Sequence, residues 1–341
     1  MTLALTRRGL LRLGAVGTAG LAVRPAVAGS FSVLRTPYLQ DLNPSEVTIA
    51  WMLDAKGTGQ VSVTDPTGAI RTFPAVVTEV PRATTGLDTS CYLYQARITN
   101  LTPGLRYSYS PTCDWLTLGS PRQSFKTPSA EVSFSFLHVA DAGTGWTAQH
   151  RIAERMSQEN VSLVLANGDL AYDIGNFQAV QSHFHDIYGD MMGSVPFYTS
   201  LGNHEYMTDA AAPSLVGRTA PASGVPPIDQ GRYYSFDWGN VHFVCLDTNT
   251  PLYRVTWGDD SMLKWLERDL SNTRKFWRVA FFHHPGYATG THQFEPEAEL
   301  VRTHIVPILE RYGVQLVLNG RSEEHTSELQ SRGLISYAVF C

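Results

Sequence analysis

The sequence predicts an all-β sandwich followed by an α/β layered domain. Up to about residue 128, short runs of alternating apolar and polar residues are separated by turn-forming clusters, which is typical of paired antiparallel strands. Beyond that point, short apolar strands end in polar loops and alternate with helical stretches, which indicates layers of helix and sheet. At 341 residues with 43% hydrophobic side chains, the chain is long enough for two cores.

The N-terminal half carries the clearest strand pattern. Val47, Ile49 and Trp51 alternate with residues of the opposite face, as expected for a strand with one face in a core. Residues 101–107, Leu-Thr-Pro-Gly-Leu-Arg-Tyr, resemble the tyrosine corner of fibronectin type III domains. We therefore expect a fibronectin III-like sandwich over residues 30–128.

The first residues differ in composition from the rest of the chain. The pair Arg7-Arg8 precedes an apolar, glycine-rich run at residues 10–23, and Ala26-Val27-Ala28 offers the small-x-small pattern of signal cleavage. The run is too short for a stable membrane span. Residues 1–29 resemble a twin-arginine signal peptide, with an ordinary secretory signal as the alternative, so we expect an exported protein in the periplasm or outside the cell.

Charge and cysteine content restrict the partners and the covalent structure. The net charge of −5 gives no overall basic field, so no nucleic acid is expected as a structural partner. Cys91 and Cys113 could form a disulfide in an oxidising compartment, whereas Cys245 lies in a buried-strand pattern and is expected to be a core thiol.

The second half predicts six strands and two long helices in alternation. The expected strands are 133–140, 161–166, 195–200, 241–247, 279–283 and 314–318, and the expected helices are 147–158 and 261–270. In such folds the functional residues gather at the carboxyl ends of the strands.

Four of these strands are followed by residue types that commonly serve as metal ligands. They run in order into Asp141, into Asp169, into Asn203 and His204, and into His283. One aspartate or one Asn-Gly pair is often a helix cap or a turn, but four such exits in order favour a metal site. Two neighbouring cations require a bridging carboxylate, further oxygen ligands and neutral imidazoles, which these residue types supply.

The order of the motifs resembles the metallophosphoesterase superfamily and, within it, the purple acid phosphatases. The motifs are Asp-x-Gly, Gly-Asp-x-x-Tyr, Gly-Asn-His-Glu and a histidine after an apolar strand. Gly143 stands where most of the superfamily has histidine, and Tyr172 follows Asp169 by three residues. The resemblance covers roughly residues 33–320 and implies an αββα catalytic domain over 129–320, incomplete at its C-terminus.

The resemblance also implies the metals and their ligands. Asp141, Asp169 and Tyr172 are expected to hold a ferric ion, because a phenolate is a hard anionic ligand. Asp169 is expected to bridge to a divalent ion (Zn, Fe or Mn) that Asn203 and His283 also hold.

The implied reaction is the hydrolysis of small phosphate monoesters by attack of a metal-bound hydroxide. His204 and, less directly, His292 are expected to face the phosphate as electrostatic or proton-donating groups. A phosphodiesterase or nucleotide pyrophosphatase on the same scaffold is one alternative, and a non-catalytic surface binding protein is another. The proline-rich stretch 207–231 is expected to flank the substrate. The sequence leaves the oligomeric state open.

The C-terminal residues depart from the family pattern. A Gly-His-x-His motif is expected after the last strand, but Gly320 is followed by Arg-Ser-Glu-Glu-His. Residues 321–341 resemble the in-frame translation of a sequencing-library adapter, so we expect an artefactual tail; a genuine, divergent C-terminus is the alternative. Either way the chain lacks one nitrogen ligand for each metal, and we expect weak metal binding and impaired activity.

Overall fold

The computed structural model describes most of the chain. The predicted signal peptide, much of the 207–231 stretch and most of the tail lie outside the described residues. The described residues are 31–120, 123–129, 133–208, 215–218, 221, 224–249, 260–288, 291–321 and 337–340. Among them, no helix is both long and apolar enough to cross a membrane.

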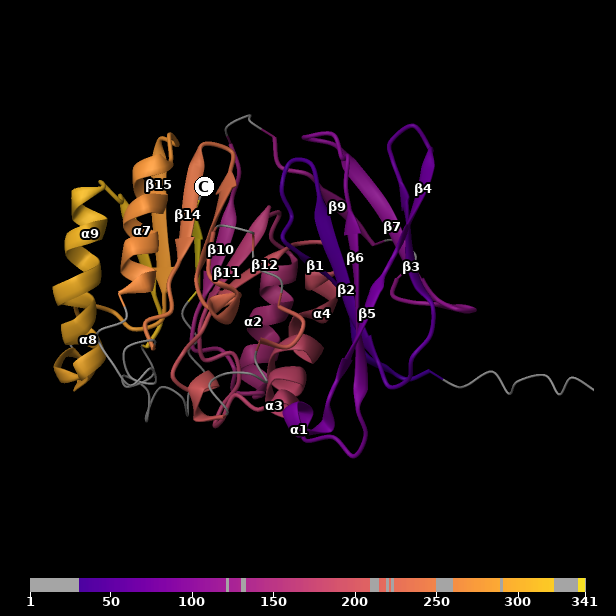
Figure 1. Cartoon of the computed structure of the whole chain (residues 1–341), viewed down its shortest axis with the longest axis horizontal. Coiled ribbons are helices and arrows are strands. Elements are labelled where there is room, and N and C mark those ends of the chain that lie inside the picture. The colour runs from indigo at the N-terminus through magenta and orange to yellow at the C-terminus, as the bar shows by residue number, and fades with distance from the viewer. Residues whose placement is uncertain are drawn as a thin grey trace, which may run out of the picture. The chain divides into compact units, whose positions relative to one another are not determined.

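The N-terminal part consists of two antiparallel sheets, which confirms the predicted sandwich (Figure 1). The first sheet has the order β1 (Val33–Gln40), β2 (Val47–Leu53), β6 (Cys91–Ile98), β5 (Val76–Val80). The second has the order β4 (Ile70–Pro74), β3 (Gly59–Thr64), β7 (Arg106–Cys113), β8 (Leu116–Thr117), and β9 (Ser124–Lys126) also pairs with β7. A one-turn helix, α1 (Arg82–Thr85), leads into β6.

Strand β2 is buried on both faces. Ile49 and Trp51 pack in the core between the two sheets, as the alternation predicts. Ala50 and Met52, on the opposite face, pack against residues of the following domain. The first sheet of the sandwich is therefore covered on both sides, which an alternating pattern alone does not reveal.

Two further sandwich features concern predictions from the sequence. The hydroxyl of Tyr107 accepts a hydrogen bond from the backbone N–H of Thr102 at 2.9 Å, the contact that a tyrosine corner makes. Cys91 and Cys113 are both free and belong to different clusters of buried side chains, so the possible disulfide is not formed. Cys245 is a buried thiol, as predicted.

The second part contains two mostly parallel sheets. One has the order β12 (Phe197–Ser200), β11 (Leu163–Asn167), β10 (Phe136–Val139), β17 (Tyr337–Phe340), with β17 antiparallel to β10. The other has the order β13 (Tyr234–Trp238), β14 (Val241–Cys245), β15 (Trp277–Phe282), β16 (Leu316–Asn319). The six strands expected from the sequence are present, and β13 and β17 are additional.

Helices cover the outer face of each sheet, so the predicted αββα arrangement is confirmed (Figure 1). The first sheet is covered by α2 (Thr147–Ser157), α3 (Phe177–Val180), the π-helix η1 (Gln181–His185) and α4 (Asp186–Met192). The second is covered by α7 (Ser261–Asn272), α8 (Pro296–Leu300), the π-helix η6 (Val301–Ile305) and α9 (Val306–Arg311). Short 3₁₀ turns are η2 (Glu205–Met207), η4 (Pro227–Asp229) and η5 (Thr291–Phe294).

The two sheets pack face to face through aromatic side chains. Phe136 of β10 meets Phe243 of β14 edge to face, with ring centroids 5.6 Å apart. Tyr198 of β12 stacks on Phe236 of β13 at 3.7 Å. Because this contact fixes one sheet against the other, residues that leave the strands of both sheets are brought together at their carboxyl ends.

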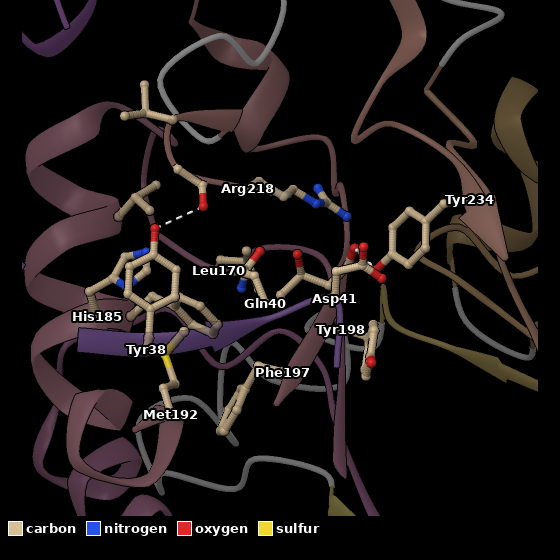
Figure 2. A pocket seen from close by; sticks show the side chains of 15 residues that line it. Tyr38, Gln40, Asp41, Leu170, His185, Met192, Phe197, Tyr198, Arg218 and Tyr234 are labelled. Atoms are coloured by element: carbon tan, nitrogen blue, oxygen red, sulfur yellow. Dashed lines mark hydrogen bonds between the residues drawn. The ribbon is translucent and has the colours of Figure 1, made fainter. Parts of the chain in front are cut away.

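Strand β1 of the sandwich also holds part of the 207–231 stretch in place. Tyr38 donates a hydrogen bond to the carbonyl of Gly217 at 2.8 Å, and the buried guanidinium of Arg35 donates to the carbonyl of Val216 at 2.8 Å. Figure 2 shows Tyr38 at one end of a small cavity that Arg218 and Tyr234 also line. Its volume of about 30 Å³ suits ordered water rather than an organic ligand.

Candidate metal centre

The loops that follow β10, β11 and β15 bring together three side chains that could hold a metal ion. One ligand atom each from Asp141, Asp169 and His283 lies within 4.8 Å of the others, and all three side chains are buried. Asp141 follows β10, Asp169 follows β11 and His283 follows β15, so the two sheets both contribute. This is the convergence that the strand-exit pattern predicts.

Both aspartates have an unusual backbone conformation. The φ angles of Asp141 and Asp169 are 53° and 51°, in the left-handed region that few residues other than glycine adopt. Aspartate tolerates this region better than most residues, but the conformation still costs free energy. Strain of this kind is concentrated at functional sites, where the surrounding structure enforces it.

The orientation of His283 leaves one ring nitrogen facing the cluster. Its Nδ1 lies 2.9 Å from the carbonyl oxygen of Asn167, so Nδ1 carries the proton and donates it. In the neutral ring, Nε2 therefore presents a lone pair, which lies 3.1 Å from Asn203 Oδ1 and 3.4 Å from Asp169 Oδ2. An amide oxygen and a carboxylate oxygen thus converge on one imidazole nitrogen, and a donor set of this chemistry fits a metal ion.

Tyr172 contacts the same carboxylate. Its hydroxyl donates a hydrogen bond to Asp169 Oδ2 at 3.1 Å. The ring lies edge to face against His204, with centroids 4.5 Å apart. The phenol oxygen is therefore directed at the carboxylate cluster and not into apolar packing. Tyr172, Asp169, Asn203 and His283 are thus linked by contacts of 3.1–3.4 Å between possible ligand atoms, and Asp141 Oδ1 lies 3.7 Å from the other ring nitrogen of His283.

The glycine at position 143 has a steric explanation. A Cβ atom there would lie 2.2 Å from the backbone carbon of Leu170 and 2.3 Å from the nitrogen of Ala171, closer than real contacts allow. No side chain fits at this position with the observed backbone. The imidazole that most of the superfamily has here is therefore excluded, and Tyr172 is the neighbouring group available to a metal.

Glu205 is a functional residue that the sequence analysis did not assign. Its buried carboxylate accepts hydrogen bonds from the backbone N–H groups of Asp169, Leu170 and Gly202, at 2.9, 2.8 and 2.7 Å. Burial and, next, the charge of Asp169 raise the pKa of Glu205 to about 7. By tying the loop after β11 to the loop after β12 (the latter carrying Asn203), Glu205 sets the spacing of the ligands. Its place in Gly-Asn-His-Glu was the available signal.

His204 lies at the edge of the cluster. Its Nδ1 is hydrogen-bonded to the carbonyl oxygen of Asp173, which directs Nε2 to a position 3.9 Å from Asp169 Oδ2. The side chain is 18% exposed, in contrast to the buried carboxylate of Asp169. An imidazole so placed can meet a molecule that approaches the cluster from solvent.

His292 lies farther out and is held by a carboxylate. Its Nδ1 is 2.6 Å from Glu295 Oε1. Glu295 in turn pairs with Arg321, whose Nη2 lies 3.1 Å from the same oxygen. His292 is therefore connected to the cluster through Glu295 and Arg321.

Arg321 lies within the cluster. Its Nη1 donates a hydrogen bond to Asn203 Oδ1 at 2.7 Å, and its backbone N–H donates to Asp141 Oδ1 at 2.9 Å. Arg321 directly follows Gly320, the position at which the expected Gly-His-x-His motif would place its first imidazole. A guanidinium is always charged and cannot act as a metal ligand, so this side chain takes the place of a ligand and opposes a bound cation.

The electrostatics of the buried groups favour a positive charge in the cluster. Burial alone would raise the pKa of Asp169, but a positive charge on the ring of His283 holds it below its usual value, and a bound metal would take the place of the Nε2 proton. His284, in contrast, is kept neutral, because burial holds its pKa well below the usual value. Its Nδ1 pairs with Thr248 Oγ1 at 2.8 Å. His283 and not His284 is therefore the imidazole that faces the cluster.

Comparisons with known proteins agree with this geometry. The family model described as calcineurin-like phosphoesterase matches residues 134–320. The chain is 27% identical over 214 residues to purple acid phosphatase 21 of Arabidopsis thaliana, which covers 60% of this chain and 47% of that protein. It is 24% identical over 264 residues to acid phosphatase type 7 of Danio rerio, which covers 70% of this chain and 57% of that protein. The chain thus spans about half the length of these curated relatives.

Solved structures show the same fold. Purple acid phosphatase PPD1 from yellow lupin seeds (Lupinus luteus) superposes with a TM-score of 0.72 at 17% identity, covering 84% of this chain and 58% of that one. The structure of PhoD superposes with a TM-score of 0.61 at 15% identity, covering 86% and 73%. At these identities the likeness establishes the fold alone.

Proposed function

Since this chain belongs to the calcineurin-like phosphoesterase family, we propose that it hydrolyses phosphate monoesters at a centre of one ferric and one divalent ion, as an acid phosphatase of the purple type. The observation that carries this proposal is the set of lone pairs on Asp169, Asn203 and His283 that face one another across about 3 Å. The similarity to curated purple acid phosphatases supports the acid phosphatase assignment.

The residues divide into two ligand sets. Asp141, Asp169 and Tyr172 would hold the ferric ion, and Asp169, Asn203 and His283 would hold the divalent ion. When bound, such a pair of cations supplies the nucleophile and neutralises the charge on the phosphoryl oxygens. The phenol of Tyr172 supports iron in the first position, since a phenolate is a hard anionic ligand.

His204 would position the ester and move a proton. With Nδ1 committed to the carbonyl of Asp173, its Nε2 is the atom that can hold a proton towards the ester oxygen or a phosphoryl oxygen. The edge of Tyr172 limits the rotation of the ring. His292, oriented by Glu295, would be a second and more distant group toward the phosphate.

Hydrolysis of p-nitrophenyl phosphate by the chain, supplied with excess iron and zinc, tests the proposal. The expected result is slow turnover, because the chain is expected to bind metal weakly; it should require added metal and be lost in Asp169→Asn. Replacement of Asp190, an exposed residue of α4, by asparagine should leave turnover unchanged. Turnover that persists in Asp169→Asn would refute the proposed site. Faster turnover of bis(p-nitrophenyl) phosphate would favour the phosphodiesterase alternative.

A further inference from the structure

The candidate site residues lie on the loops that follow β10, β11, β12 and β15, and each of these loops also carries an exposed apolar side chain. Trp146 is 53% exposed on the loop after β10, Ile174 is 43% exposed after β11, and Met207 is 52% exposed after β12. Tyr287 and Phe294, 72% and 83% exposed, lie on the loop after β15. We call these five residues the apolar rim.

Their position is tied to the site by the chain itself. Trp146 follows Asp141 by five residues, Met207 follows His204 by three, and Phe294 follows His292 by two. Single exposed apolar residues are ordinary on a protein surface. Here each of the four site loops contributes at least one, although the loops come from four different strands of two sheets.

Three of the five rim residues lie on short, hydrogen-bonded turns. The backbone N–H of Trp146 is bonded to Thr144 Oγ1 at 3.2 Å, and helix α2 begins directly after Trp146. The N–H of Met207 is bonded to the carbonyl of His204 at 3.3 Å. Phe294 ends the turn η5. A surface held in this way binds an apolar group at a lower cost in conformational entropy than a mobile loop would.

The geometry of the site determines what the rim can contact. Asp169 and His283 are fully buried at the carboxyl ends of the strands, whereas His204 is partly exposed. A phosphoryl group that reaches the buried ligands must direct its organic substituent outward, past the loops that carry the rim. Three of the five rim residues are aromatic, and aromatic rings bind flat apolar groups well.

We propose that the apolar rim binds the alcohol portion of the substrate and selects aryl and other bulky apolar phosphate monoesters over small polar ones. This inference rests on the proposed phosphatase function, because it assigns the phosphoryl group to the metal ligands. Burial of roughly 50–60 Å² of apolar surface in the rim is worth about a factor of ten in affinity.

Non-hydrolysable ligands test this preference without the difference in reactivity between esters. Dissociation constants of benzylphosphonate and methylphosphonate are measured by calorimetry on the chain saturated with iron and zinc. We expect benzylphosphonate to bind about tenfold more tightly. Trp146→Ala and Phe294→Ala should each reduce this ratio and leave the affinity for methylphosphonate unchanged. Trp115→Ala, at a 62% exposed tryptophan of the sandwich, is the matched control and should leave both affinities unchanged.

The outcomes separate this inference from the function it rests on. The proposed role of the rim is overturned if the two phosphonates bind with equal affinity, or if both rim variants leave the affinity ratio unchanged. Either result leaves the phosphatase proposal intact. Failure of both ligands to bind the metal-saturated chain overturns the proposed function and the rim together. A dimer in sedimentation that dissociates in Phe294→Ala would assign the rim to a second copy of the chain and overturn the substrate role.

Discussion

The Nε2 atom of His283 lies 3.4 Å from Oδ2 of Asp169, although the two residues come from strands of different sheets. This contact joins the two halves of the αββα domain at one point. Because Nδ1 of His283 donates to a backbone carbonyl, Nε2 is the nitrogen whose lone pair, in the neutral ring, can bind a cation beside Asp169.

Removal of the Asp169 carboxylate charge should abolish high-affinity metal binding. Asp169 would be shared by both ions, so Asp169→Asn is expected to weaken binding by more than the roughly 10–100-fold typical of losses in the outer shell of a metal site. Calorimetric titration with Zn²⁺ measures the effect, with Asp190→Asn as the control. Unchanged Zn²⁺ affinity in Asp169→Asn would contradict the ligand assignment.

Replacement of Arg321 should strengthen metal binding. Its guanidinium donates a hydrogen bond to Asn203 Oδ1 and places a permanent positive charge beside the candidate ligands. We expect Arg321→Ala to raise the affinity for Zn²⁺ by about tenfold, equivalent to about 1.4 kcal/mol. Arg311→Ala removes an arginine whose partner is the surface residue Glu267, and it should have no effect. An Arg321→Ala variant with the affinity of the original chain would show that Arg321 does not compete with the metal.

Arg321 is the first residue of the C-terminal tail, which follows Gly320. We propose that residues 321–341 are translated adapter sequence, and we expect amplification of the source locus beyond the codon for Gly320 to give Gly-His-x-His. An intact genomic frame that encodes the present tail would contradict this. The pairing of β17 with β10 joins backbones, and any extended segment can satisfy it.

Stability should fall in alkaline solution because of His242. Burial alone would lower the pKa of His242, but hydrogen bonds from the ring to Asp237 and Asp269 at 2.7 and 2.8 Å raise it to about 9. The pKa is thus higher in the folded than in the unfolded chain. The stabilisation is complete below the unfolded pKa of about 6.5 and is lost as the pH rises through about 9.

Urea unfolding between pH 6 and 9.5 measures this contribution. Asp237 is half exposed and is shared with Lys275, whose Nζ lies 3.5 Å away, so solvent screening reduces the gain to about 1–3 kcal/mol. His242→Asn should flatten the decline in the free energy of unfolding, and His150→Asn, at an exposed position of α2, should not. An equally steep decline in His242→Asn would exclude this histidine as the cause.

The tyrosine corner should stabilise the sandwich. Tyr107→Phe removes the acceptor for the N–H of Thr102, and loss of such a hydrogen bond is expected to lower the free energy of unfolding by about 1–2 kcal/mol. Tyr287→Phe changes a hydroxyl on a 72% exposed side chain and should cost much less. Chemical denaturation of the two variants gives the comparison, and equal stabilities would contradict the structural role of the corner.

Much of the fold and the candidate site could be predicted from the sequence because both depend on local patterns. Apolar runs that end in Asp141, Asp169 or His283 indicate strands and their exits without any tertiary information. Helix α7 was predicted because Leu266 and Leu270 repeat on one face, and both are buried.

The remaining features depend on contacts between distant segments. Strand β2 is buried on its second face by side chains of the following domain, so its alternation understates its burial. Glu205 acts through three backbone N–H groups on two loops, and no spacing rule identifies such an acceptor. Position 143 excludes a side chain only because the backbone of Leu170 passes close to it, which the motif alone does not explain.

The visible absorption spectrum of the iron- and zinc-saturated chain tests the central claim most directly, because it reports whether Tyr172 and the carboxylates share one iron ion. We predict a tyrosinate-to-iron charge-transfer band that is lost in Tyr172→Phe while the bound iron, measured by mass spectrometry, is retained in part. An iron-loaded chain without the band, or a band that persists in Tyr172→Phe, would contradict the claim that these side chains surround a common metal centre.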